Sequence, residues 1–176
     1  AHLLAHTSGL RPDVDLADDW RGTPAALDLA RDEVPLAPPG ERFIYSDINF
    51  FVLGDIVRTV SGETLDVFTR RTIFEPLGMR DTGFLPALPL HARVAPTERC
   101  REMDAWPCRR PGEPPLRAVV HDPTARRMGG VAGHAGLFGT ASDLGRFARM
   151  LLGGGTLDGV RVLAPATVAR MTSRAT

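Results

Sequence analysis

The sequence predicts a helix-rich fold with long loops and few strands. Apolar residues recur at helical spacing in several separate segments, whereas the strict alternation typical of half-buried strands is rare. A long stretch rich in proline interrupts the helical pattern and predicts an irregular loop. The apolar fraction of 43% and the charged fraction of 24% are those of an ordinary globular protein. A length of 176 residues suits one domain or a large piece of one.

The first helix is expected to begin at Thr23, which we interpret as its N-cap because Pro24 follows at the first helical position. Val34-Pro35 ends it, since proline cannot continue a helix. Two further helices are predicted, one closed by Ser61-Gly62 and one ended at residues 75–78. Their apolar faces are Phe50, Leu53, Gly54, Val57 and Val60 in the first, and Leu65, Phe68 and Ile73 in the second.

A Pro/Arg-rich loop is predicted over residues 85–118, where seven prolines lie between positions 85 and 115. Long loops inside compact domains are usually functional or mobile. The loop holds the only two cysteines, Cys100 and Cys108. Two interpretations stay open for this pair, a disulfide in an oxidising compartment or two free thiols.

The last third of the chain predicts two helices and a tight turn. Thr140 with Asp143 forms a capping-box pattern ahead of an amphipathic helix that Gly153 to Gly155 stop. Leu157-Asp158-Gly159 fits a tight turn between short extended pieces. A final helix over Pro165 to Met171 is expected to turn Val168 and Met171 inward.

The charge composition excludes several classes of protein. All 21 basic residues are arginine, the net charge is zero, and lysine is absent. Without lysine a phosphate-binding P-loop cannot form, and no basic excess favours nucleic acid. Neither a signal peptide nor an apolar run of membrane length is visible. Since Ala1 to Leu4 read like the middle of a helix, we expect both ends to be cuts within a longer protein.

Four segments of the chain together resemble one known family. They are Leu3–Leu10 (LLAHTSGL), 39–47 (PGERFIYSD), 73–82 (IFEPLGMRDT) and 136–144 (GLFGTASDL). In the same order they are similar to the LLxHxSGL, PGxxxxYSN, IFxPLGMxxT and GGLxSTAxDL segments of the serine β-lactamase-related family. That family includes class C β-lactamases, D-alanyl-D-alanine carboxypeptidases and esterase-like penicillin-binding proteins.

The resemblance implies an α-rich fragment of an α+β, β-lactamase/transpeptidase-like fold. Residues 1–176 would be one incomplete domain, comprising the helical part and its return toward the sheet. The parent would be a serine acyl-hydrolase that acts through an acyl-enzyme on a small-molecule or peptidoglycan-derived acyl substrate, without metal or organic cofactor. A bacterial periplasmic or envelope location is implied by the resemblance alone. The alternative is a non-catalytic relative that binds peptidoglycan or a protein.

The nucleophile of that chemistry is missing from this chain. The family's Ser-x-x-Lys and Lys-Thr-Gly-like elements both need lysine, so we expect the chain alone to be inactive. Ser8 is no substitute, because Thr7-Ser8-Gly9 lacks the strand-turn-helix context of a nucleophile elbow.

Tyr45 is the candidate catalytic residue, since it matches the family tyrosine that assists proton transfer. A phenol with its ordinary pKa near 10 would need a shift of roughly three pKa units, about 4 kcal/mol, to act as phenolate at neutral pH. Close cations supply such shifts. We therefore expect Tyr45 to lie in a crevice that receives an acyl donor, with its cationic partners on segments outside the chain. The competing interpretation is that Tyr45 merely packs before a helix.

Three further residues are candidates for substrate binding. Asp47 stands where the family usually has asparagine, and it either alters substrate choice or simply caps the helix, with Asn49 replacing part of the lost donor function. His134 lies in a glycine-rich turn and either lines the pocket or makes a structural hydrogen bond. His6 is expected in the cleft wall.

Metal and dinucleotide binding are disfavoured. The spacings of 30, 1 and 12 residues among His91, His121, Asp122 and His134 match no compact zinc pattern. The glycines of residues 130–136 lack the leading strand of a dinucleotide-binding motif.

Overall fold

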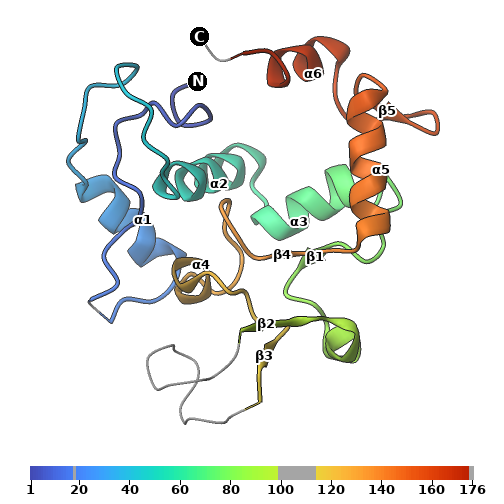
Figure 1. Ribbon diagram of the computed structural model, residues 1–176, viewed down its shortest axis with the longest axis horizontal. Coiled ribbons are helices and arrows are strands. Elements are labelled where there is room, and N and C mark those ends of the chain that lie inside the picture. Colours follow the sequence, from blue (N-terminus) through green and yellow to red (C-terminus); the bar gives the residue numbers. More distant parts are fainter. Residues whose placement is uncertain (18, 99–113, 175–176) are drawn as a thin grey trace.

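The computed structural model describes residues 1–17, 19–98 and 114–174, and it is rich in helices (Figure 1). The prediction of a helical fold with few strands is confirmed. The α-helices are α1 (Thr23–Asp32), α2 (Ile48–Ser61), α3 (Leu65–Thr69), α4 (Pro123–Arg127), α5 (Ala141–Leu152) and α6 (Pro165–Met171). A π-helical turn, η1 (Arg70–Phe74), continues α3, and a 3₁₀ helix, η2 (Leu88–Arg93), lies farther along the chain.

The strands are short and form three antiparallel pairs. These are β1 (Gly83–Phe84) with β4 (Leu137–Phe138), β2 (Pro96–Glu98) with β3 (Leu116–Arg117), and β5 (Thr156–Leu157) with β6 (Val160–Arg161). The second pair and η2 fall inside the predicted loop of residues 85–118, so that prediction is wrong for its described ends. Cys100 and Cys108 lie outside the described residues.

Helix α1 begins one residue earlier than its sequence suggests. Gly22 is the N-cap, with a φ of 86°, and it adopts the left-handed region that favours glycine. The predicted N-cap, Thr23, lies inside the helix, and its hydroxyl donates to the backbone oxygen of Met128 at 3.2 Å. This bond ties the start of α1 to the end of α4.

Helix α2 ends as predicted, but its most buried side chains lie beside the predicted apolar face, which is only partly buried. Gly62 adopts a φ of 74° and donates its backbone N–H to the oxygen of Arg58, which closes the helix. Val60 of the predicted apolar face is 83% exposed, whereas Ile48 and Phe51 are buried. The spacing identified a helix but not the side that its neighbours cover.

The pattern at the start of α5 is half confirmed. The Thr140 hydroxyl accepts from the backbone N–H of Asp143 at 3.2 Å, as an N-cap should. The carboxylate of Asp143 does not return to the cap; it accepts from the backbone of Asp81 at 2.8 Å and from the hydroxyl of Thr82 at 2.9 Å. Asp143 therefore joins α5 to the segment that precedes β1.

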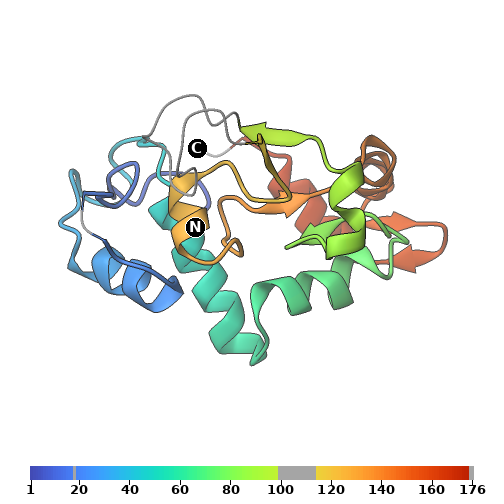
Figure 2. The same ribbon diagram turned by 90° about the horizontal axis from the view of Figure 1, so that it is seen from below.

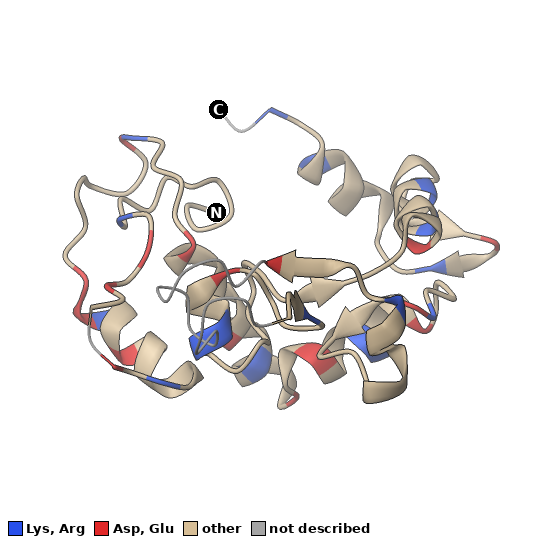
Figure 3. Cartoon of the chain, turned by 60° about the horizontal axis from the view of Figure 1, so that its bottom comes forward, with Lys and Arg blue, Asp and Glu red and all other residues tan. Residues whose placement is uncertain are grey.

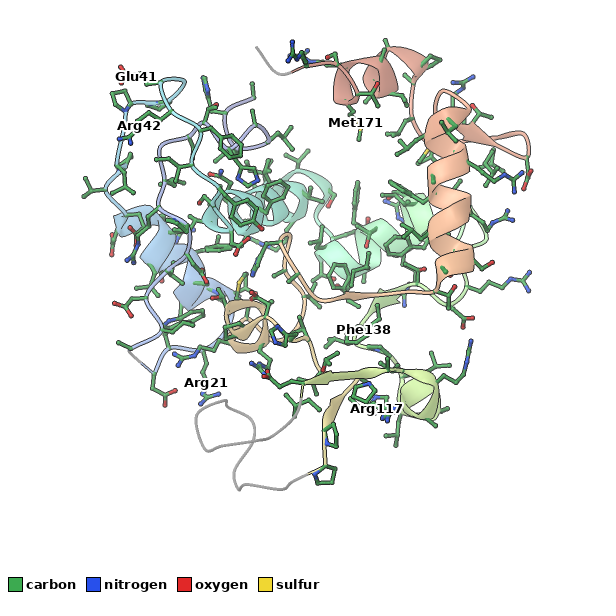
Figure 4. All side chains as sticks on the ribbon, viewed as in Figure 1. Arg21, Glu41, Arg42, Arg117, Phe138 and Met171 are labelled. Atoms are coloured by element: carbon green, nitrogen blue, oxygen red, sulfur yellow. The ribbon has the colours of Figure 1, made fainter. Side chains whose placement is uncertain are left out.

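The predicted tight turn and final helix are both present. Asp158 and Gly159 join β5 to β6, with φ values of 48° and 83°, as a two-residue hairpin turn of this hand requires. Helix α6 has Val168 buried, but Met171 is 59% exposed, so its inward prediction is wrong. Figure 4 marks Met171 on α6.

Buried apolar residues form two clusters. Figure 2 shows the elements that carry them, with α1, α2 and α4 on one side and α5 with the β5–β6 hairpin on the other. The first cluster joins the N-terminal segment to α1, α2 and α4, with Trp20, Ile48, Phe51 and Met128 among its members. The second joins η1 to α5 and β5, with Phe74, Leu77, Met79, Met150 and Leu157. Helices α2 and α3, which contact each other, connect the two halves.

Acidic and basic residues are interspersed along the described chain (Figure 3). Ion pairs within α1 and within α2, and between α5 and the β5–β6 turn, bring opposite charges together. Among the described residues, none of the helices is long and apolar enough to cross a membrane.

Candidate functional site

Tyr45 lies two residues before Asp47, the N-cap of α2, and stacks on His6. The two ring centroids are 4.7 Å apart, with an angle of 28° between the planes. The next residue, Ser46, donates its backbone N–H to Nδ1 of His6 at 3.0 Å. One imidazole therefore supports the phenol with its face and the neighbouring backbone with its edge.

The backbone on both sides of Tyr45 is fixed by hydrogen bonds. Ile44 donates its N–H to the oxygen of His6 at 2.8 Å, and Asp47 donates to the oxygen of Pro12 at 2.7 Å. The buried hydroxyl of Ser46 donates to the oxygen of Arg11 at 2.6 Å. The segment that carries the phenol is thus attached to residues 6–12, which overlap the Leu3–Leu10 segment.

A buried polar pair lies beneath this attachment. The Ser8 hydroxyl donates to Oδ1 of Asn49 at 2.6 Å, and Nδ2 of Asn49 lies 3.3 Å from Nδ1 of His6. Both Ser8 and Asn49 are buried. The sequence suggested that Asn49 replaces part of a substrate-facing donor. Its side chain is instead buried against Ser8 and His6. Sequence reasoning also missed the role of Ser8, because an isolated serine carries no signal for a contact 41 positions away.

The electrostatic surroundings of Tyr45 are negative. Asp47 raises the pKa of Tyr45 above its ordinary value, first through a hydrogen bond to the phenol and then through its charge, and Asp122 adds a smaller effect of the same sign. The phenol is therefore protonated at neutral pH. No residue of this chain supplies the lysine that the resemblance places beside it.

The expected crevice is not formed by the described residues. Tyr45 is 59% exposed, and neighbouring Phe43 is 71% exposed. The largest of three described cavities, a cleft of about 680 Å³, lies instead between the segment before β2 and residues 135–140. Tyr45 lines none of the three. Its hydroxyl faces solvent beside Asp47, so the expectation of a crevice within this chain is wrong.

Asp47 occupies the N-cap position of α2, but its side chain makes no cap hydrogen bond. The interpretation as a simple helix cap is therefore wrong. Its carboxylate instead acts on Tyr45. Burial raises the pKa of nearby Asp13, and the charges of Asp122 and Asp47 add smaller effects of the same sign. Whether Asp47 contacts a substrate stays a prediction.

His134 is a buried hydrogen-bonding residue. Its side chain is 2% exposed, and its Nε2 lies 3.0 Å from Oδ1 of Asp122. The ring packs edge-on against Phe51 of α2, with centroids 5.4 Å apart. This arrangement matches the structural interpretation that was left open, and His134 does not line the described cavities.

Asp122 connects His134 to the start of α4. Burial raises the pKa of Asp122, but hydrogen bonds from His134 and from the backbone N–H of Ala125 outweigh it, so that the pKa lies below its ordinary value. The structure thus brings together Tyr45, Asp47 and His6, and holds His134 in a separate, buried pair. Within the described ranges, with residues 18 and 99–113 excepted, acidic, histidine and cysteine side chains form no group of metal-binding composition.

The fold is similar to that of solved penicillin-binding proteins. A penicillin-binding protein from Bacillus halodurans superposes with a TM-score of 0.68 at 24% identity, covering 98% of this chain and 49% of that one. A penicillin-binding protein homologue from Caulobacter crescentus gives a TM-score of 0.68 at 25% identity, with 98% and 48% covered.

The family model described as Beta-lactamase matches residues 1–176, and the chain belongs to this family. A protein of Salmonella schwarzengrund described as "Putative D-alanyl-D-alanine carboxypeptidase" is 36% identical over 143 residues. That match covers 77% of this chain and 33% of the relative, so the chain spans about a third of the length of the curated relatives it matches.

Proposed function

We propose that this chain is part of a serine acyl-hydrolase of the β-lactamase, D-alanyl peptidase or esterase type, in which Tyr45 transfers the proton. One observation carries the proposal: the segment that bears Tyr45 is held in place by hydrogen bonds of the buried Ser46 to His6 and Arg11, and the phenol stacks on His6. Holding a reacting group in one orientation lowers the entropic part of a reaction barrier. Membership of the Beta-lactamase family supports the same chemistry.

The proposal requires cations from outside this chain. Asp47 keeps the phenol of Tyr45 protonated, so base action needs a compensating positive charge close to the hydroxyl. This chain contains no lysine and spans about a third of its curated relatives. We place the Ser-x-x-Lys and Lys-Thr-Gly-like elements on other segments of a longer protein, where they would face Tyr45.

The first experiment tests the chain alone. We expect the purified 176-residue chain to show no labelling by a fluorophosphonate probe and no turnover of a nitrophenyl ester or a chromogenic cephalosporin. Loss of the nucleophile in a serine hydrolase costs about 10⁶ in kcat. Stoichiometric labelling of a serine in this chain would contradict the proposal.

The second experiment tests Tyr45 in a longer protein that includes a Ser-x-x-Lys segment. Replacing Tyr45 with Phe should lower kcat by about 10²–10⁴, the range for loss of a positioned proton-transfer group. The control is Phe43→Tyr, which adds a phenol at a nearby exposed site. Phe51→Tyr is unsuitable because Phe51 is buried. Unchanged kcat in the Tyr45→Phe protein would show that the phenol takes no part.

A non-catalytic binding protein is the second candidate, and Asp47 favours it. A carboxylate that raises the pKa of the phenol opposes base action. This candidate predicts that the longer protein binds peptidoglycan fragments without turnover, and that Asp47→Asn does not produce turnover. Appearance or strong enhancement of turnover in the Asp47→Asn protein would instead support the enzyme.

A further inference from the structure

We propose that His6 is a positioning residue for Tyr45, and that the Ser8–Asn49 pair sets its orientation. The imidazole would hold the Ser46 backbone with its Nδ1 and the Tyr45 phenol with its face. The importance of this device for catalysis rests on the proposed role of Tyr45, but its existence is tested below without any activity measurement. The expectation that His6 lies in the wall of the substrate cleft stays a prediction.

The hydrogen bonds determine which nitrogen of His6 carries the proton. A backbone N–H can only donate, so Nδ1 of His6, 3.0 Å from the nitrogen of Ser46, must accept. Nδ2 of Asn49, at 3.3 Å, faces the same nitrogen and also donates. Neutral His6 therefore carries its proton on Nε2.

The Ser8 hydroxyl fixes the orientation of the Asn49 amide. Its oxygen accepts the backbone N–H of Leu10 at 3.2 Å, and its hydrogen goes to Oδ1 of Asn49 at 2.6 Å. With Oδ1 occupied, the NH₂ group of Asn49 is the one that faces His6. Each group in this chain of contacts leaves the next with a single compatible role.

The backbone of His6 is held in an uncommon conformation. Its φ is 54°, in the left-handed region that non-glycine residues rarely adopt and that persists only where the surroundings enforce it. Two further rings surround the imidazole: Phe43 edge-on at 5.8 Å and Phe50 tilted at 5.2 Å. The ring that supports Tyr45 is thus fixed by neighbours on several sides.

The hydrogen bonds that Ser46 and Asp47 make to Arg11 and Pro12 do not fix the phenol. The hydroxyl of Ser46 and the N–H of Asp47 hold the backbone through Arg11 and Pro12, without His6. The Tyr45 side chain, by contrast, is exposed; its ring stacks on His6, and its hydroxyl donates to Asp47. Loss of the imidazole should therefore alter the direction of the phenol more than the fold.

Two substitutions separate the two functions of the ring. His6→Asn retains an acceptor near the position of Nδ1 and tolerates positive φ, but lacks the stacking face. His6→Phe keeps a ring and lacks the acceptor. Ser8→Ala leaves His6 intact and frees the Asn49 amide. His91→Asn is the matched control, because His91 lies in η2 and contacts Pro86 instead.

The measurement is NMR of the 176-residue chain, in which Tyr45 is the only tyrosine and gives one set of ring signals. We expect His6 in the Nε2–H tautomer. His6→Phe should speed amide exchange of Ser46 at least about fivefold, as for one ordinary hydrogen bond, and His6→Asn should restore the protection while shifting the Tyr45 ring signals. Ser8→Ala should speed the amide exchange of Ser46 and shift the Tyr45 ring signals, and His91→Asn should change neither quantity.

An Nδ1–H tautomer in the unmodified chain would overturn the proposal. So would Tyr45 ring signals that stay unchanged in His6→Asn, or Ser46 exchange that stays unchanged in His6→Phe. If His6→Phe fails to fold, the proposal is still tested by the tautomer of His6 and by the signals of His6→Asn and Ser8→Ala. Failure of these measurements leaves the fluorophosphonate and turnover results of the proposed function untouched, so the two can fail separately.

Discussion

Asp47 and Tyr45 form a pair in which the carboxylate opposes ionisation of the phenol. Because the carboxylate accepts from the protonated phenol and repels the phenolate, it raises the pKa of Tyr45. A parent enzyme that used Tyr45 as a base would have to overcome this effect with nearby cations. The family asparagine, which Asp47 replaces, would not impose it.

We therefore predict that Asp47→Asn lowers the pKa of Tyr45 toward the ordinary value near 10. The absorbance of the ionised phenol measures this directly, because no other tyrosine is present. Asp55→Asn on the same helix is the control, since Asp55 pairs with Arg58 instead. A pKa that rises or stays constant in Asp47→Asn would show that the carboxylate does not act on the phenol.

We predict that the folded chain loses the stabilising contribution of Asp122 in acid. Its pKa is lowered in the folded protein, so its ionised form contributes stability at neutral pH that is lost as the pH falls below the ordinary value of about 3.9 and through the folded value. Asp122→Asn keeps an acceptor for Ala125 but removes the charge. We expect a loss of up to about 1 kcal/mol at neutral pH, since the group is only half buried, and a smaller difference from the unmodified chain in acid.

Denaturation by urea at a series of pH values measures both expectations. Asp81→Asn serves for comparison, because Asp81 pairs with Arg93 at the exposed surface. If the difference in free energy of unfolding between Asp122→Asn and the unmodified chain grows in acid, the prediction is contradicted.

At the scale of elements, the glycine-rich turn before β4 packs directly on α2. A Cβ atom added at Gly133 would lie 2.1 Å from the backbone oxygen of Phe50, so only glycine fits there. Next to it, His134 contacts Phe51 of the same helix. The turn therefore packs on the helix that follows Tyr45 and Asp47.

Gly133→Ala should consequently destabilise the fold by about 1–3 kcal/mol or more, because backbone atoms cannot move aside as a flexible side chain can. Gly145→Ala is its matched control. Gly145 lies inside α5 with open space around it, so alanine there should stabilise by about 0.5–1 kcal/mol. Midpoints of urea denaturation measure both changes, and a neutral Gly133→Ala would show that the turn does not rest on α2.

Signals that depend on backbone conformation predicted the elements best. Gly62 at the end of α2 and Asp158-Gly159 between β5 and β6 behave as their sequence suggested, because positive φ is a local property. Helix faces were predicted less well. Val60 and Met171 are exposed although their spacing is apolar, since burial depends on which distant segment packs against a helix.

In the candidate site, too, local features were predicted better than contacts between distant segments. Motif resemblance placed His6 and Tyr45 in one region, and the structure confirms that they are in contact. The roles of Ser8 and Asn49 could not be predicted, because they depend on contacts between segments about 40 residues apart. The direction of the Tyr45 pKa shift likewise depends on where Asp47 points.

At the scale of the molecule, the chain exposes more surface than a compact protein of its mass. Its accessible surface is 11102 Å², against roughly 8,400 Å² for a typical 19.0 kDa monomer. Large apolar side chains contribute to the excess, including Leu4, Phe43, Leu144 and Leu152. The two buried clusters share no member.

We therefore predict that the isolated chain binds a dye specific for exposed apolar surface and unfolds with low cooperativity on heating. Hydrogen exchange should resolve two classes of protected amides, one for each cluster. Circular dichroism with dye titration measures the first expectation. A single sharp melt without dye binding would show that the chain folds as a self-sufficient unit.

The exposure of the only tyrosine has a practical consequence. A reagent that iodinates phenols would place its heavy atom at a single tyrosine, two residues before the N-cap of α2. In crystals of the protein or of a longer form, that iodine would provide one anomalous scatterer at a known residue. Its position would reveal directly which atoms of any added segment come to lie opposite the phenol.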